Sequence, residues 1–151
     1  MGVSLVTPLR ASEPAAPWSL WIVEPGRPGM LDTCAFASLS EDRHPHRVTQ
    51  DVTIHWHGGD LVQRASASAS PRANDRNPLD TCFVLTTGKT VVATGAVVSH
   101  FSARLLRFDT LVRRSDHVLE FDLLPSYPGQ LAQSVRAEWN LALTPLSLRN
   151  P

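Results

Sequence analysis

Two histidines separated by one residue, His55 and His57, form the pair of side chains in this sequence that is best suited to bind a metal ion. Side chains alternate between the two faces of an extended strand, so both imidazoles would lie on one side, about 6.5 to 7 Å apart at the backbone. Imidazole nitrogens at that spacing can share a metal ion. The sequence therefore predicts a candidate metal site at His55 and His57. Its alternative is a polar strand face that carries two ordinary titratable histidines.

Further ligands for such a site are present nearby in the sequence. His44 and His46 form a second pair with the same spacing, and Asp51 or Asp60 would supply a carboxylate. An extended chain from residue 46 to residue 55 spans about 30 Å. Only a strong bend would bring the two histidine pairs together. We therefore expect a polar strand face rather than a complete metal site.

The segment Thr53–Gly58, Thr-Ile-His-Trp-His-Gly, resembles the histidine-rich strand of multicopper oxidases. The resemblance implies copper ligands at His55 and His57. Those enzymes also need further His-x-His pairs and a His-Cys-His segment, and this chain has no His-Cys-His. The resemblance covers six residues of the chain, and we do not expect a copper oxidase.

Other catalytic patterns give way to simpler interpretations. Residues 86–90 superficially suggest a phosphate loop, but a hairpin turn fits them better because an apolar strand, not a helix, follows. Cys82 with His100 as its base would need an activated thiolate, and nothing in the sequence activates this sulfur.

The two cysteines, Cys34 and Cys82, both end a Leu-Asp-Thr-Cys tetrapeptide, and we expect two buried, reduced thiols. The sequence predicts no enzyme and no cofactor.

Composition limits the classes of partner. Fourteen basic and fourteen acidic residues give a net charge of zero, which argues against a nucleic-acid binder. No stretch is long and apolar enough to read as a signal peptide or a membrane span, so we expect synthesis in the cytoplasm. Lys89 is the only lysine, and arginine suits planar ion pairs at protein interfaces.

The elements that would position these residues are mostly strands. Residues 48–57 and 118–124 alternate apolar and polar side chains, as half-buried strands do, and 81–98 reads as a hairpin that turns at Gly88. One short helix is expected over 130–136. Further strands are predicted over 18–23, 33–37, 61–65, 101–112 (with a bulge at Leu105-Leu106) and 137–143.

This spacing of short strands and turns predicts an all-β domain, namely an antiparallel β-sandwich or barrel of jelly-roll type. The domain would span residues 18–143, with a long surface loop over 66–78. Residues 1–17 are expected to form an extended arm and residues 144–151 a C-terminal tail, because both are rich in proline and weakly patterned.

A chain of this kind is suited to contact with other proteins, through arms that add strands or wrap neighbours. In general style it is similar to the small β-rich structural proteins of bacteriophage particles, such as capsid decoration, cement or tail subunits. We therefore expect a non-enzymatic assembly protein that forms a homo-oligomer or a larger assembly, and that ends in a virion, with no membrane contact. The alternatives are a β-domain that binds a small molecule or carbohydrate, and a cupin-like metal-dependent enzyme that uses His55 and His57.

Overall fold

The computed structural model describes Gly2 and residues 18–27, 29–65, 78–101, 106–126 and 132–147, the first five of the last stretch by backbone alone. The predicted arm over 1–17 lies outside the described residues apart from Gly2. So do the loop over 66–77, the bulge position Leu105 and the end of the chain from residue 148.

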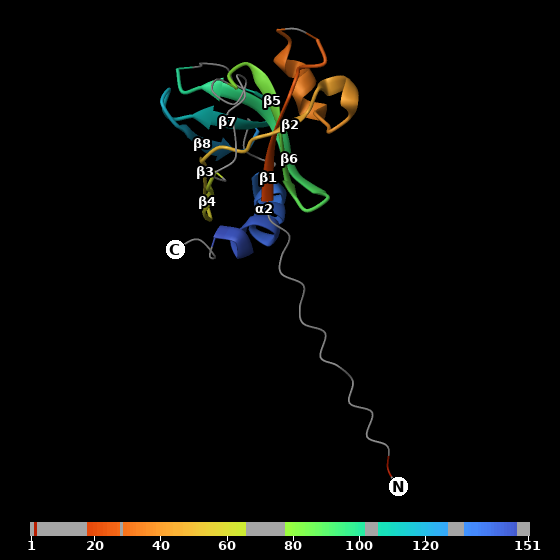
Figure 1. The fold of residues 1–151 in the computed structure, drawn as a ribbon, viewed down its shortest axis with the longest axis vertical. Helices are drawn as coiled ribbons and strands as arrows, with labels where there is room; N and C mark the ends of the chain where they lie inside the picture. The colour runs from red at the N-terminus through yellow and green to blue at the C-terminus, as the bar shows by residue number, and fades with distance from the viewer. Residues whose placement is uncertain are drawn as a thin grey trace.

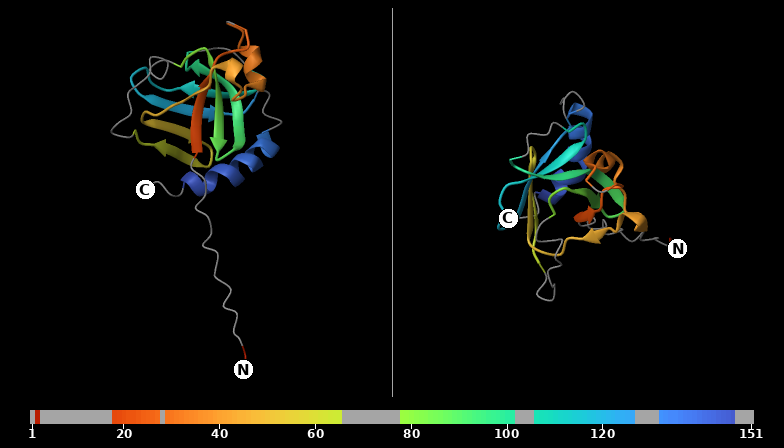
Figure 2. Two further views of the ribbon diagram at one scale, coloured as in Figure 1. Left: turned by 45° about the vertical axis from the view of Figure 1, so that its right-hand side comes forward. Right: turned by 90° about the horizontal axis from the view of Figure 1, so that it is seen from above.

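The strands of the described chain form one sheet of eight strands, curled into a half-barrel (Figure 1, Figure 2). The order across the sheet is β2-β1-β5-β6-β7-β8-β3-β4. The strands are β1 (Trp18–Val23), β2 (His46–Arg47), β3 (Val52–Trp56), β4 (Gly59–Gln63), β5 (Thr81–Thr87), β6 (Thr90–Ser99), β7 (Asp109–Arg113) and β8 (Leu119–Leu124).

The all-β class is confirmed, but the finer prediction needs correction. The pairs β6–β7 and β3–β8 are parallel, so the sheet is mixed rather than antiparallel. The two packed sheets of a jelly roll are not confirmed, because all strands that the structure describes pair in a single sheet. Sequence patterning gives the faces of a strand but not its neighbours, and this is why the parallel pairs escaped prediction.

The long strand predicted over residues 48–57 is interrupted in the structure. Its beginning pairs with β1 at one edge of the sheet, where the Val48 amide donates to the Leu20 carbonyl, whereas β3 lies near the opposite edge. The Gln63 side chain donates to the carbonyls of Val48 and Gln50 at 2.8 and 2.9 Å. A few residues therefore connect two distant positions in the strand order, which requires the sheet to curl until its edges approach each other.

The inner face of the curl holds the main hydrophobic core. Apolar side chains at alternate positions point inward from β1, β3, β5 and β8, as the alternation predicted for residues 48–57 and 118–124. The most deeply buried include Leu20, Ile54, Leu61, Phe83, Leu85, Leu111 and Phe121.

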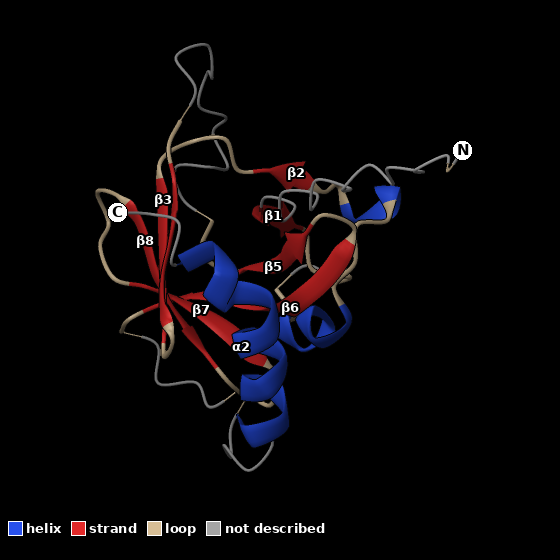
Figure 3. Ribbon diagram, turned by 90° about the horizontal axis from the view of Figure 1, so that it is seen from below, coloured by secondary structure: helices blue, strands red, loops and turns tan. Residues whose placement is uncertain are grey.

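One α-helix, α2 (Ala132–Ser147), covers this inner face (Figure 3). It contacts β6 in the middle of the sheet and β4 at its edge. The prediction of a strand over 137–143 is wrong, and the predicted boundary before the tail at 144 falls inside the helix. Trp139, Leu143 and Leu146 recur at helical spacing and are buried, whereas Leu141, placed with them in the strand interpretation, is 83% exposed.

The outer face of the sheet carries a second, smaller core under a short 3₁₀ helix, η1 (Leu31–Phe36). The strand predicted over 33–37 is therefore wrong. Thr33 shapes this segment by donating from its hydroxyl to the Met30 carbonyl and accepting from the Gly26 amide, both at 2.8 Å. A second 3₁₀ turn, η2 (Glu41–Arg43), follows.

Cys34 of η1 and Cys82 of β5 form a disulfide, so the prediction of two reduced thiols is also wrong. Both residues are fully buried, as expected. Forty-eight positions separate them in the sequence, and only the fold brings them together. The bond fastens η1 to the centre of the sheet.

Candidate functional site

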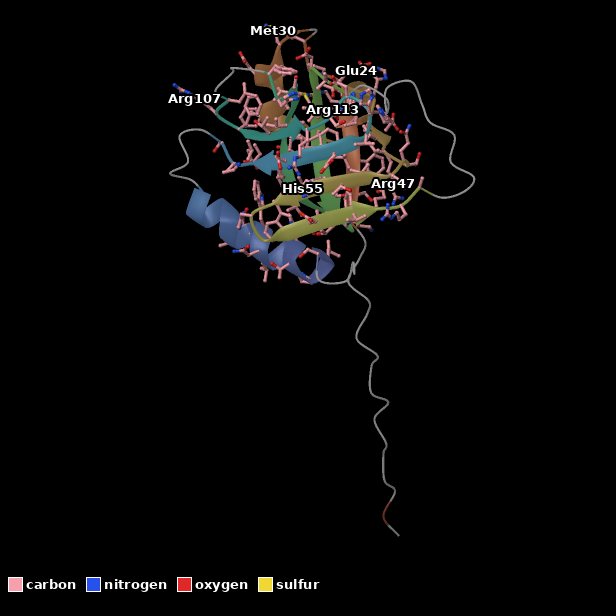
Figure 4. All side chains as sticks on the ribbon, turned by 90° about the vertical axis from the view of Figure 1, so that its left-hand side faces the viewer. Glu24, Met30, Arg47, His55, Arg107 and Arg113 are labelled. Atoms are coloured by element: carbon pink, nitrogen blue, oxygen red, sulfur yellow. A yellow bond between two sulfur atoms is a disulfide. The ribbon has the colours of Figure 1, made fainter. Side chains whose placement is uncertain are left out.

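His55 lies on the outer face of β3 between two carboxylates (Figure 4). Its Nδ1 donates to Asp60 Oδ1 at 2.7 Å, and its Nε2 donates to Glu120 Oε1 at 2.6 Å. Asp60 is directly opposite His55 in the β3–β4 hairpin, and Glu120 comes from the parallel neighbour β8. The imidazole therefore ties the edge strand β4 to β8 across β3.

This arrangement favours the protonated form of His55. A carboxylate only accepts hydrogen bonds, so contacts to two carboxylates favour the form in which both ring nitrogens carry protons. Burial lowers the pKa of His55, but the hydrogen bonds to Glu120 and Asp60 outweigh it, and the pKa is raised above 6.5. A doubly protonated imidazole has no lone pair for a metal ion and no capacity to act as a general base.

The charged network continues along β8. Arg114 Nη1 donates to Glu120 Oε1 at 3.2 Å, and its Nε lies 3.5 Å from Asp122 Oδ2. The alternation over 118–124 placed both acidic side chains outward, but it did not indicate that they would face His55. That juxtaposition follows from the parallel pairing of β3 with β8, and no pattern in the sequence predicts this pairing.

His57 does not share the environment of His55. It lies in the turn after β3, where its Nε2 donates to Asn140 Oδ1 of α2 at 3.1 Å. Its ring stacks on Trp139, with centroids 6.1 Å apart and 24° between planes, and meets Trp56 edge to face at 4.9 Å. His57 therefore contacts the helix, while His55 binds carboxylates on the sheet.

The other proposed ligands are distributed over the molecule. His46 lies in the edge strand β2, opposite Ile22, and His44 ends η2 at 3.9 Å from Glu24. Asp51 accepts a hydrogen bond from the Ala65 amide at 2.7 Å. Among the residues that the structure describes, no group of three or more His, Cys, Asp or Glu is arranged to hold a metal. The metal site at His55 and His57 stays a prediction.

Two surface cavities lie at opposite ends of the parallel pair β3–β8. The first, which we term the strand-start cavity, has a volume of about 600 Å³ and is lined by residues that include Gln50, Asp51, Arg113, Asp116, His117 and Val118. The second, the strand-end cavity, has about 300 Å³, and His55, Trp56, His57 and Asp122 contribute to its walls. All three residues of the His-Trp-His segment thus border one small cavity.

Comparison of the chain with protein-family models, curated proteins and solved structures gives no match. Any function must therefore be argued from the geometry. In the described part of the chain, no helix is long and apolar enough to cross a membrane.

Three exposed apolar side chains lie in and next to η1. Met30, Phe36 and Leu39, which we term the η1 patch, are 45%, 87% and 38% exposed within ten residues of chain. Figure 4 labels Met30 at the far end of the molecule from α2. Sequence reasoning missed this surface, because it assigned Phe36 to a strand and so to a packed sheet.

A single carboxyl group on the inner face has a strongly shifted pKa. Burial raises the pKa of Asp109, at the start of β7, to about 6, although the Ser126 amide donates to its carboxylate and opposes the shift. Glu138 of α2 adds to the increase through like-charge repulsion. Asp109 lines neither the strand-start cavity nor the strand-end cavity, so we attribute its raised pKa to the packing of α2 on the sheet.

Proposed function

We propose that this protein is a non-enzymatic assembly subunit that associates with further copies of itself through the η1 patch. The observation that carries the proposal is the 87% exposure of Phe36 on a fixed backbone. A phenylalanine side chain in contact with water forgoes roughly 1.5 to 3 kcal/mol of burial free energy. Aromatic side chains with such unburied area are typical anchors at protein interfaces.

The backbone around Phe36 is held against the sheet, and this favours binding. Cys34 is bonded to β5 two residues before it, and Leu31 and Ala37 on either side are buried against the sheet. A side chain presented by an ordered backbone loses less conformational entropy on association than one presented by a flexible loop. The η1 patch is therefore suited to act as a preformed contact.

A second copy is the partner that the charge of the chain favours. Equal numbers of acidic and basic residues give no net repulsion between copies, and proteins near zero net charge associate more readily. Closed dimers commonly use the same surface on both subunits, and an apolar patch is complementary to itself.

The chemistry of the titratable residues supports a role outside catalysis. Both nitrogens of His55 donate to carboxylates, and both cysteines are engaged in the disulfide, so neither offers a free nucleophile or base. A disulfide persists in oxidising surroundings, among them the surfaces of virions. This supports, as part of the proposal, the interpretation that the assembly is a bacteriophage particle whose subunit leaves the cytoplasm.

Sedimentation velocity of the full chain from about 1 µM to about 1 mM tests the proposal. We expect concentration-dependent dimers or larger species in the wild type. Phe36→Ser should weaken association, whereas the matched control Leu141→Ser, at an equally exposed apolar residue of α2, should leave it unchanged. A monomer at all concentrations, or equal effects of the two substitutions, would contradict self-assembly through the η1 patch.

A further inference from the structure

The strand-start cavity lies where β3 and β8 begin and where β7 ends. Its volume of about 600 Å³ falls within the range of small-molecule sites, about 300 to 1,000 Å³. The residues on its walls include one buried cation, two carboxylates, an imidazole and a carboxamide. We propose that this cavity binds a small, neutral, polyhydroxylated molecule such as a monosaccharide or cyclitol.

The requirement for an acceptor oxygen comes from Gln50. Its side-chain nitrogen Nε2 is buried and has no hydrogen-bond partner. A buried donor without a partner is unfavourable, and most such groups in folded proteins are satisfied by protein, water or ligand. Gln50 lines the cavity, so an oxygen atom of a ligand that reaches its carboxamide would supply the missing acceptor.

The requirement for donors comes from the carboxylates. Asp51 accepts from the Ala65 amide through Oδ1, and a carboxylate has the capacity to accept further hydrogen bonds from a ligand. Asp116 adds a second carboxylate to the wall. A hydroxyl group both donates and accepts, so several hydroxyls on one small molecule match Gln50 and the two aspartates together.

The charges around the cavity disfavour an ionic ligand. The guanidinium of Arg113 is buried and donates to the carbonyls of Ser115 and Asp116, at 2.7 and 3.2 Å, so it stabilises the turn after β7. The carboxylates of Asp51 and Asp116 repel an anion, and the positive charge of the nearby Arg113 reduces their attraction for a cation. Val118 and Leu119 contribute apolar surface, which suits the C–H face of a ring.

Titration of the isotope-labelled full chain by two-dimensional NMR tests the proposal, with glucose, galactose, mannose and myo-inositol as probes. We expect at least one of them to bind with a Kd of roughly 1 mM or lower and to shift the amide signals of residues 50, 51 and 116–119. Citrate and spermidine, as anionic and cationic probes, should not shift them. If no neutral probe shifts these signals, or if a charged probe binds better, the proposed ligand class is wrong.

Two substitutions separate binding from folding. Gln50→Met keeps the volume but removes the unpaired amide, so it should weaken binding about tenfold or more while the melting temperature stays equal or rises. Asp51→Asn keeps the oxygen that accepts from Ala65 and should also weaken binding. The control Asp32→Asn, at an exposed aspartate in η1, should bind as the wild type does. Wild-type affinity in both cavity variants would overturn the proposal.

Discussion

The outer face of the sheet has two halves that differ in what their outward side chains meet. Over β5 and β6, buried apolar and cysteine side chains point outward beside Thr86 and Thr94, and η1 packs on them. Over β4, β3 and β8, several outward side chains are charged, partly exposed and bonded to one another, beside the uncharged Thr53 and Val62. The covered half is represented by Cys82, Val84, Ala96 and Val98, and the charged half by Asp60, His55, Glu120 and Asp122.

Different forces therefore stabilise the two halves of one continuous sheet. The covered half is stabilised by apolar burial and by a covalent bond, and neither depends on protonation or on the screening of charges. The charged half is stabilised by ion pairs in contact with water, which contribute little each and depend on protonation and on ionic strength. Substitutions should therefore have large effects under η1 and on the inner face, and small effects in the charged network.

The largest effect is expected on the inner face beneath the charged half. Phe121 is fully buried, so Phe121→Ala should lower the free energy of unfolding by about 3 to 5 kcal/mol. Its neighbour Glu120 points outward, and Glu120→Ala should cost under about 1 kcal/mol. Urea denaturation of both variants measures the two values. Similar costs at the two positions would mean that the two faces of β8 are assigned wrongly.

Removal of the disulfide tests the covered half. The double substitution of Cys34 and Cys82 by alanine should cost about 2 to 4 kcal/mol, because the unfolded chain regains the freedom of a long closed loop. Under reducing conditions, the melting temperature of the wild type should fall to about that of the double variant. Equal stability of the oxidised wild type and the double variant would show that burial alone holds η1 on the sheet.

A carboxyl under α2 should respond to pH more than the exposed carboxylates do. The pKa of Asp109 is raised from 3.8 to about 6, so the folded state binds the proton more tightly than the unfolded state. Its stabilising contribution is present below about pH 4 and is lost as the pH rises through about 6. Asp109→Asn should remove this loss and melt higher than the wild type at pH 7. A constant difference between the two melting curves across this range would refute the assignment.

The smallest effect belongs to the charged network. The folded pKa of His55 is raised, so its contribution is complete below the unfolded value of 6.5 and is lost as the pH rises through the higher folded value. His55→Gln should therefore lower the melting temperature slightly below pH 6.5 and have less effect once the pH exceeds the folded pKa of His55. His57→Gln, the control, removes the bond to Asn140 instead. An NMR titration that places the pKa of His55 below 6.5 would contradict the network.

Local pattern was sufficient to predict much of the fold. The alternation of Val52, Ile54 and Trp56 and that of Leu119, Phe121 and Leu123 gave the strands and their inward faces correctly. Gly88, with its positive φ of 61°, gave the β5–β6 hairpin. These signals are local because a strand's faces and a tight turn depend on neighbours in the sequence.

The remaining features depend on contacts between distant segments. The disulfide, the parallel pair β3–β8 and the meeting of His55 with Glu120 join residues that are 48 or more positions apart. No periodicity within a segment encodes them. The helix α2 is different, because the spacing of Trp139, Leu143 and Leu146 was visible in the sequence, and the strand interpretation instead grouped every second residue.

A photo-crosslink at the η1 patch tests whether copies of this chain associate through it. Benzoylphenylalanine in place of Phe36 should yield covalent dimers on irradiation of the full chain, with the attached peptide mapping to residues 29–40 of the second copy. The same label in place of Leu141 should leave the protein monomeric on denaturing gels. Dimers from position 141 with none from position 36, or attachment elsewhere in the second copy, would contradict the account.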